Sequence, residues 1–194
     1  MGPKPTIREG STAVGSLCRS GSAQCDPGTG MMARKSVYIE TSIVSYLTAR
    51  PSNNLLAAAW QGVTVDWWDA RRNQFDLFIS ATVIEEASQG DSRAAARRLE
   101  ALAGIPLLPI TGAVATLSKL LINEGGVPRK ALEDALHIAV SSIHGIDYLL
   151  TWNCRHIDNA ETKPLIRKIC ATHGYSCPEI CTPQELMGVS SDDR

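Results

Sequence analysis

The feature that most constrains the fold is a repeated alternation of short apolar runs and longer stretches with helical periodicity. The apolar runs of strand length lie at 36–40, 75–80, 105–110, 147–152 and 178–182. Gly and Pro mark many of the boundaries between these runs and the stretches that separate them. Strands that alternate with helices are typical of a mainly parallel sheet covered by helices. We therefore expect one α/β domain.

The helices are expected at 42–48, 55–72, 82–88, 91–103, 112–124, 128–144 and 161–173. Pro128 would occupy the first turn of its helix, where a missing N–H costs nothing. Thr82 and Glu85 have the spacing of a capping box, which gives Glu85 a local structural role. Thr182 and Glu185 have the same spacing, so a last helix is expected to begin there.

Composition places the chain among globular proteins and limits how it can contact nucleic acid. The chain has 194 residues, of which 44% are hydrophobic, and a formal net charge of −1. No apolar run approaches the roughly 18–20 residues that a membrane span needs, so no membrane association is expected. Binding of RNA through bulk positive charge is excluded, and any contact must come from a local basic patch.

The ends of the chain differ from its middle. Residues 1–35 are rich in Gly, Ser, Thr and Pro, which predicts a disordered extension, and 189–194 are expected to be a flexible tail. The domain is expected at 36–188, and Met31 and Met32 just before it offer an alternative start. The extension has no apolar segment of signal-peptide length, and the six cysteines are sparse and irregular. Both features favour a reducing cytoplasm.

Carboxylates follow the first two expected strands, where ligands collect in open parallel sheets. Glu40 ends the first run and is followed by Thr41 and Ser42, which could equally cap the next helix. Glu86 lies in the helix after the second run. A solvated side chain is the simpler interpretation of either glutamate. We favour a site for Glu86 because, unlike Glu85, it has no capping role.

A third carboxylate interrupts an apolar helical stretch. Asp134 has Ile138 at i+4 and His137 at i+3, whereas Glu133 has basic neighbours at i−3 and i−4 and is expected to be solvated. A carboxylate on a partly apolar flank must be paired, hydrogen-bonded or bound to a metal. We interpret Asp134 as a metal ligand. His137 is expected to be half-buried and to donate to a backbone carbonyl or to Asp134.

Together, Glu40, Glu86 and Asp134 would form an all-oxygen site, which suits Mg²⁺ or Mn²⁺. Mg²⁺ is usually held by a few carboxylates, with water and phosphate oxygens completing its coordination. The matching chemistry is hydrolysis of a phosphodiester, with the ion activating water and neutralising charge in the transition state.

Four segments carry a resemblance to a known family: "VYIETSIVSYL", "FISATVIEEA", "ALEDALHIAVSSIHGIDYLLTWNCRHI" and "ICTPQELM". Together they resemble the PIN-domain family, close to the VapC-like toxins of type II toxin–antitoxin pairs, over about 36–188. The resemblance implies a three-layer α/β/α sandwich and a Mg²⁺- or Mn²⁺-dependent ribonuclease. It also implies a homodimer and an antitoxin that blocks the active cleft.

The resemblance assigns catalytic positions. Glu40 stands where the family usually has an Asp, while Glu86 and Asp134 match its acidic positions. Asn153 stands at the fourth, usually acidic, position, and His156 stands where many relatives carry another Asp. These two departures suggest a single ion or weak activity. They keep open an alternative, a catalytically weak or inactive PIN-fold module that binds RNA or protein.

Contacts with the substrate are expected from hydroxyl and basic side chains. The resemblance suggests that Thr41 and Thr151 position water or phosphate. Arg129, Lys130 and Arg155 flank the acidic positions in the sequence and are the preferred phosphate contacts, although any of them could simply be solvated.

Two further sets of residues have competing interpretations. Trp60, Trp67 and Trp68 recur at helical spacing, which favours an aromatic face buried in the core over a surface for a partner. The possible zinc ligands Cys170, His173, Cys177 and Cys181 lack the spacing of common zinc modules. Buried thiols are the favoured interpretation of these cysteines.

Overall fold

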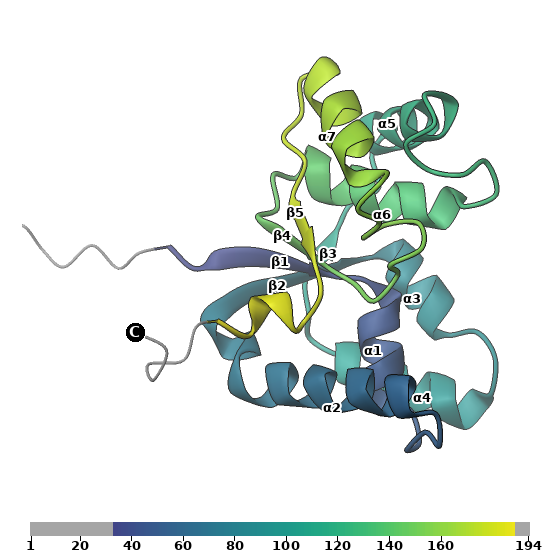
Figure 1. Ribbon diagram of the computed structural model, residues 1–194, viewed down its shortest axis with the longest axis vertical. Coiled ribbons are helices and arrows are strands. Elements are labelled where there is room, and N and C mark those ends of the chain that lie inside the picture. Colours follow the sequence, from purple (N-terminus) through teal and green to yellow (C-terminus); the bar gives the residue numbers. More distant parts are fainter. Residues whose placement is uncertain (1–32, 189–194) are drawn as a thin grey trace, which may run out of the picture. The chain divides into compact units, whose positions relative to one another are not determined.

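The computed structural model describes residues 33–188, which contain five strands and seven α-helices (Figure 1). The strands are β1 (Lys35–Ile39), β2 (Phe75–Ser80), β3 (Leu107–Leu108), β4 (Tyr148–Leu150) and β5 (Glu179–Cys181). The α-helices are α1 (Thr41–Thr48), α2 (Leu55–Ala70), α3 (Ala81–Ala87), α4 (Ser92–Leu102), α5 (Gly112–Asn123), α6 (Leu132–Ile143) and α7 (Lys163–Thr172). The tail expected at 189–194 lies outside the described residues, as does most of the extension expected at 1–35. Residues 33–35 are described, and there the prediction is one residue too long, because β1 already begins at Lys35.

The five strands form one sheet in the order β3-β2-β1-β4-β5, and every pairing in it is parallel. Val37 of β1 is in register with Leu77 of β2 and with Tyr148 of β4. The chain runs outward from β1 to β3 and then returns to β4 on the other side of β1. Strand order therefore reverses beside β1, and such reversals create the crevice where ligands bind in open α/β sheets.

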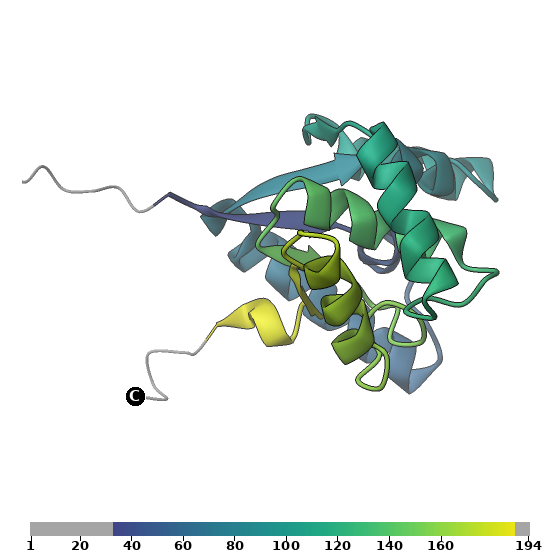
Figure 2. The same ribbon diagram turned by 90° about the horizontal axis from the view of Figure 1, so that it is seen from above.

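Helices cover both faces of this sheet. Figure 1 shows α5, α6 and α7 on one side of the strands and α1, α2 and α4 on the other, and the turned view in Figure 2 agrees. The predicted three-layer α/β/α sandwich is confirmed. None of the helices within 33–188 combines the length and the apolar character that a membrane span requires.

The central strand explains why the sheet needs two helical layers. Val37, Tyr38 and Ile39 of β1 are all fully buried, as expected of a parallel strand covered on both faces. Trp67 and Trp68 of α2 are also buried, and Trp60 is half-buried and packs against the core, which confirms the core interpretation of the three tryptophans.

Two predicted boundaries are wrong because proline interrupts backbone hydrogen bonding. Helix α6 begins at Leu132 rather than at residue 128, since the carbonyl of Pro128 closes a turn by accepting from the N–H of Ala131 at 2.9 Å. The strand expected over 105–110 is reduced to Leu107–Leu108, because prolines at 106 and 109 supply no N–H to the ladder.

The two predicted capping boxes have different outcomes. Helix α3 begins at Ala81, so Thr82 lies inside the helix, and no side chain caps this end. Glu85 is consequently an exposed side chain without the predicted cap. At the other end, Thr182 N–H donates to Glu185 at 2.8 Å, and Glu185 N–H donates back to Thr182 Oγ1 at 3.3 Å. This box forms, but the helix after it is only a short 3₁₀ helix, η2 (Glu185–Met187).

Candidate metal centre

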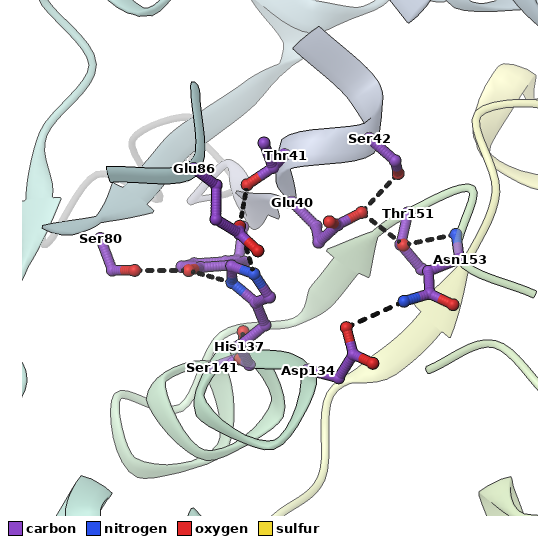
Figure 3. Close-up of polar contacts among 11 residues, drawn as sticks. Glu40, Thr41, Ser42, Ser80, Glu86, Asp134, His137, Ser141, Thr151 and Asn153 are labelled. Carbon is purple, nitrogen blue, oxygen red and sulfur yellow. Dashed lines mark hydrogen bonds and ion pairs between the residues drawn. The ribbon is translucent and has the colours of Figure 1, made fainter. Parts of the chain in front are cut away.

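The predicted acidic positions lie at the carboxyl ends of the strands or at the start of a helix that faces them (Figure 3). Glu40 directly follows β1 as the N-cap of α1, and Glu86 lies on α3, which follows β2. Asp134 lies in the first turn of α6, and Asn153 follows β4. The topology thus gathers side chains that are far apart in the sequence.

Glu40 is a buried carboxylate held by hydroxyl groups. Glu40 is only 5% exposed. Its Oε2 accepts hydrogen bonds from Thr151 Oγ1 at 2.7 Å and from Ser42 Oγ. Within residues 33–188, its Oε1 accepts no hydrogen bond, and no lysine or arginine pairs with it. A buried carboxylate is costly unless its charge is compensated, so this oxygen is well suited to a cation.

Glu86 is arranged in the same way. Its Oε2 accepts from Thr41 Oγ1 and from His137 Nε2, the latter at 3.0 Å, which leaves Oε1 free to bind a ligand. Burial raises the pKa of Glu86, but the hydrogen bonds and the charge of His137 outweigh it. The pKa of Glu86 therefore lies below its ordinary value.

His137 differs from the prediction because it contacts neither Asp134 nor a backbone carbonyl through its ring. It is fully buried, its Nδ1 is hydrogen-bonded to Tyr38 Oη at 2.9 Å, and Tyr38 Oη is bonded to Ser80 Oγ at 2.6 Å. Burial lowers the pKa of His137, but the contact with Glu86 and the nearby carboxylates raise it overall. This buried chain of polar groups fixes the ring against Glu86.

Glu40, Glu86 and His137 offer ligand atoms that all lie within 4.8 Å of one another. Among residues 33–188, no other group of three or more His, Cys, Asp or Glu side chains lies close enough together to hold an ion. A nitrogen that donates to Glu86 has no lone pair left for a metal. His137 can therefore act as a ligand only if it gives up that hydrogen bond, and the two glutamates are the simpler ligands.

Asp134 lies outside this group, and both of its oxygens are already engaged. Its Oδ1 accepts from Asn153 Nδ2 at 2.9 Å, and its Oδ2 contacts His156 Nδ1 at 2.8 Å. Its place in the first turn of α6 also lets the helix dipole stabilise its charge. A link to Glu40 runs through Asn153, whose N–H donates to Thr151 Oγ1 at 2.9 Å.

The predicted substrate contacts divide into two kinds. Thr41 and Thr151 donate to the two glutamates, so both hydroxyls position carboxylates. Arg129, Lys130 and Arg155 are exposed on two loops. The first loop precedes α6, which carries Asp134, and the second follows β4 and carries Asn153.

Sequence reasoning missed the parts of the centre that depend on long-range contacts. Tyr38 and Ser80 read as ordinary strand residues, and Ser42 reads as a helix cap. Ser42 Oγ instead donates to Glu40 and accepts from the N–H of Trp152 at 2.8 Å. Its position two residues after Glu40 was the one local signal of such a role.

The alternative zinc site is not supported. Cys170 and Cys181 are buried, as expected of core thiols, and Cys177 is half-buried against the core. In the described part of the chain, these cysteines do not join a group that could hold an ion.

Comparison with known proteins agrees with this architecture. No curated protein matches the chain. The PIN domain family matches residues 37–161, which include the last three residues of β1, the whole of β2 to β4 and all four of the predicted catalytic positions. With its parallel sheet and its cluster of acidic side chains, the chain belongs to the PIN domain family and has a nuclease fold.

Proposed function

We propose that this protein is a Mg²⁺- or Mn²⁺-dependent ribonuclease that hydrolyses phosphodiester bonds of RNA. The observation that supports it best is the pair of glutamates, Glu40 and Glu86. Each has one oxygen held by hydroxyl groups or His137 and a second oxygen without a partner among the described residues. Carboxylates arranged in this way have the oxygen donors that a hard cation prefers.

When bound, the ion would supply an activated water and neutralise charge that develops on the phosphate. The protein contributes positioning. Thr41 and Thr151 hold the glutamates, while Asn153 and His156 hold Asp134 as a further acidic group beside them. This arrangement requires no side chain to act as the nucleophile.

Arg129, Lys130 and Arg155 are the proposed phosphate contacts, because their loops carry or adjoin Asp134 and Asn153. Their contribution is electrostatic and independent of sequence, so it would orient the strand without selecting bases. This fits a chain whose net charge of −1 leaves no general affinity for nucleic acid.

The deciding experiment compares Asp134→Asn with Glu133→Gln. These neighbours on α6 differ in burial: the side chain of Asp134 is 16% exposed and holds two hydrogen bonds, whereas Glu133 is exposed. We expect wild type and Glu133→Gln to cleave single-stranded RNA with Mn²⁺ or Mg²⁺. Asp134→Asn should lose at least about 100-fold in kcat/KM, the upper range for groups that support a metal site.

Equal cleavage by Asp134→Asn and wild type would contradict the assignment and point to a contaminating nuclease. If wild type binds RNA but does not cleave it, the alternative of an inactive PIN-fold binding module is favoured. Glu40 and Asn153, which depart from the usual acidic residues, are the reason for that alternative. A filter-binding measurement in EDTA separates these outcomes, because it does not require catalysis.

We further propose that the protein is the cytoplasmic toxin of a VapC-like pair, acting as a homodimer and blocked by an antitoxin. The support is the resemblance of its motifs. Expression of wild type in bacteria should arrest growth, whereas expression of Asp134→Asn should not. A toxin role is contradicted if both variants arrest growth, or if neither does although wild type cleaves RNA.

A further inference from the structure

A second candidate site lies at the far end of α1 from the acidic side chains. A cavity of about 370 Å³ opens between the C-terminal part of α1 and the helix α4. Its lining includes Ser45, Thr48, Arg50, Asp91, Arg97 and Arg98. Glu40, Glu86, Asp134 and Asn153 take no part in it, so it is distinct from the candidate metal centre.

The charge of the cavity is strongly unbalanced. Its three arginines face a single carboxylate, Asp91, whose Oδ1 is used to cap α4 by accepting from Ala94 N–H at 2.9 Å. Within residues 33–188, none of these arginines forms an ion pair with a carboxylate. Guanidinium groups that lack a protein counter-charge are well suited to an oxyanion.

Two of the arginines are held in place by backbone carbonyls. Arg97 Nε donates to the carbonyl of Thr48 at 3.0 Å, and Arg98 Nε donates to that of Ala87 at 2.9 Å. Arg98 also donates from Nη2 to the carbonyl of Gln89 at 2.5 Å, so Nη1 is the terminal group it keeps fully for another acceptor. Within residues 33–188, Arg97 donates through Nε alone and keeps both of its terminal groups. Because the side chains are already ordered, an anion would bind with a smaller entropy cost.

One face of α1 connects this cavity with the metal centre. Thr41, Ser45 and Thr48 occur at i, i+4 and i+7, which places them on the same side of the helix. Thr41 donates to Glu86, while Ser45 and Thr48 line the cavity. Seven residues of α-helix rise by about 10 Å, so a polar stripe of this length joins the two sites.

We propose that the cavity binds a backbone phosphate of the same RNA strand that is cut at the metal centre. This rests on the proposed ribonuclease function. One strand of a DNA duplex rises by about 3.4 Å per nucleotide along the axis, so a separation of about 10 Å lies within a few nucleotides of the cleaved bond. The cavity would then determine how far an RNA must extend beyond the cleaved bond to bind well.

Arg50→Gln and Arg93→Gln test this proposal as a matched pair. Arg50 lines the cavity, and its side chain forms no hydrogen bond within 33–188, so its replacement should not disturb folding. Arg93 is an exposed arginine on α4 that does not line the cavity. Both substitutions remove one positive charge.

The first measurement is the affinity for a single-stranded RNA in EDTA over a range of salt concentrations. Loss of one phosphate contact should reduce the log–log salt slope by about 0.7 in Arg50→Gln, and the slope of Arg93→Gln should stay at the wild-type value. With Mn²⁺, a long RNA should show a raised KM in Arg50→Gln. An RNA too short to span both sites should be cleaved equally by all three proteins.

The proposal is overturned if the salt slope of Arg50→Gln equals that of wild type. It is also overturned if Arg93→Gln reduces the salt slope as much as Arg50→Gln does. It is also overturned if inorganic phosphate perturbs the Arg98 guanidinium signals in NMR while RNA affinity does not depend on Arg50, because the ligand would then be a free phosphate. If wild type fails to cleave RNA but Arg50→Gln alone loses slope, the cavity still binds the strand and only the ribonuclease function fails.

Discussion

The two adjacent glutamates on α3 allow a direct test of metal binding that does not depend on catalysis. Glu86 accepts two hydrogen bonds within the candidate metal centre, whereas its neighbour Glu85 is exposed. The informative comparison is Glu86→Gln against Glu85→Gln. Both substitutions remove one negative charge from the same helix, but only the first removes a proposed ligand.

The expected magnitude follows from linkage between binding and unfolding. An ion at 100 times its Kd stabilises the folded state by about 2.7 kcal/mol, which raises the Tm of a domain of this size by about 5–11 °C. Loss of a charged ligand should weaken binding by at least about 100-fold, the upper range for outer-shell partners. At the same ion concentration, the stabilisation of the folded state then falls to about 0.4 kcal/mol, which corresponds to a rise in Tm of about 1–2 °C.

The assay is thermal unfolding of each protein in EDTA and in Mn²⁺. The comparison is made within each variant, so any change in the stability of the metal-free protein cancels. Glu85→Gln should keep the wild-type rise in Tm, and Glu86→Gln should lose most of it. An equal rise in Glu86→Gln and wild type would refute the assignment of Glu86. If Glu85→Gln loses as much of the Mn²⁺-induced rise in Tm as Glu86→Gln does, the effect reflects the net charge of the helix and not a specific ligand.

Two further substitutions test the surroundings of the centre. Asn153→Asp replaces the amide that donates to Asp134 at 2.9 Å by a second negative charge. In EDTA, this should lower the free energy of unfolding in urea by about 1–3 kcal/mol. Adding Mn²⁺ should stabilise this variant more than it stabilises wild type. For Asp147, burial raises the pKa, but hydrogen bonds from Lys35 and Ser36 outweigh it and hold the pKa below the ordinary value of an aspartate. The stability that Asp147 contributes is therefore present above the unfolded-state pKa and is lost as the pH falls through the folded-state pKa. Asp147→Asn should therefore lower stability at neutral pH and flatten the acid limb of an unfolding curve.

Clear results would contradict either prediction. If Asn153→Asp matches wild type in EDTA, the contact with Asp134 is not formed in solution. If Asp147→Asn unfolds with the same pH dependence as wild type below pH 4, the contacts of Asp147 with the N-terminal part of β1 contribute nothing to stability.

The order of elements was predictable because the sheet is parallel and buried. Strands covered on both faces read as continuous apolar runs, and Val37 to Ile39 form such a run. The positions of Glu40 and Glu86 could be inferred for a related reason. Each follows a recognisable strand, and the carboxyl edge of such a sheet is where ligands gather.

The contacts that orient those carboxylates could not be predicted, because they join residues far apart in the chain. His137 is bonded to Tyr38 across 99 residues, and Thr151 is bonded to Glu40 across 111. A periodicity argument specifies which face of an element is buried, but not the partner it meets there. The predicted role of His137 was wrong for this reason. The burial of His137 depends on its contacts with β1 and α3, which the local sequence does not reveal.

The start of α6 shows a further limit of local rules. Proline is favoured in the first turn of a helix, but it is equally suited to a preceding turn, and Pro128 occupies the turn. The later start moves Asp134 into the first turn of the helix. A carboxylate there is stabilised by the helix dipole as well as by Asn153 and His156, so its presence before an apolar stretch does not by itself require a metal.

The strongest evidence for an ion consequently comes from the junction of β1 and α1 rather than from Asp134. Three consecutive residues, Glu40, Thr41 and Ser42, supply one buried carboxylate and two hydroxyls that donate to Glu86 and Glu40. These donors stabilise two nearby negative charges before any cation arrives, which keeps the metal-free site ordered. Because the hydroxyls use only one oxygen of each carboxylate, binding an ion need not break them. A site that retains its hydrogen bonds on loading loses little of its binding energy to reorganisation.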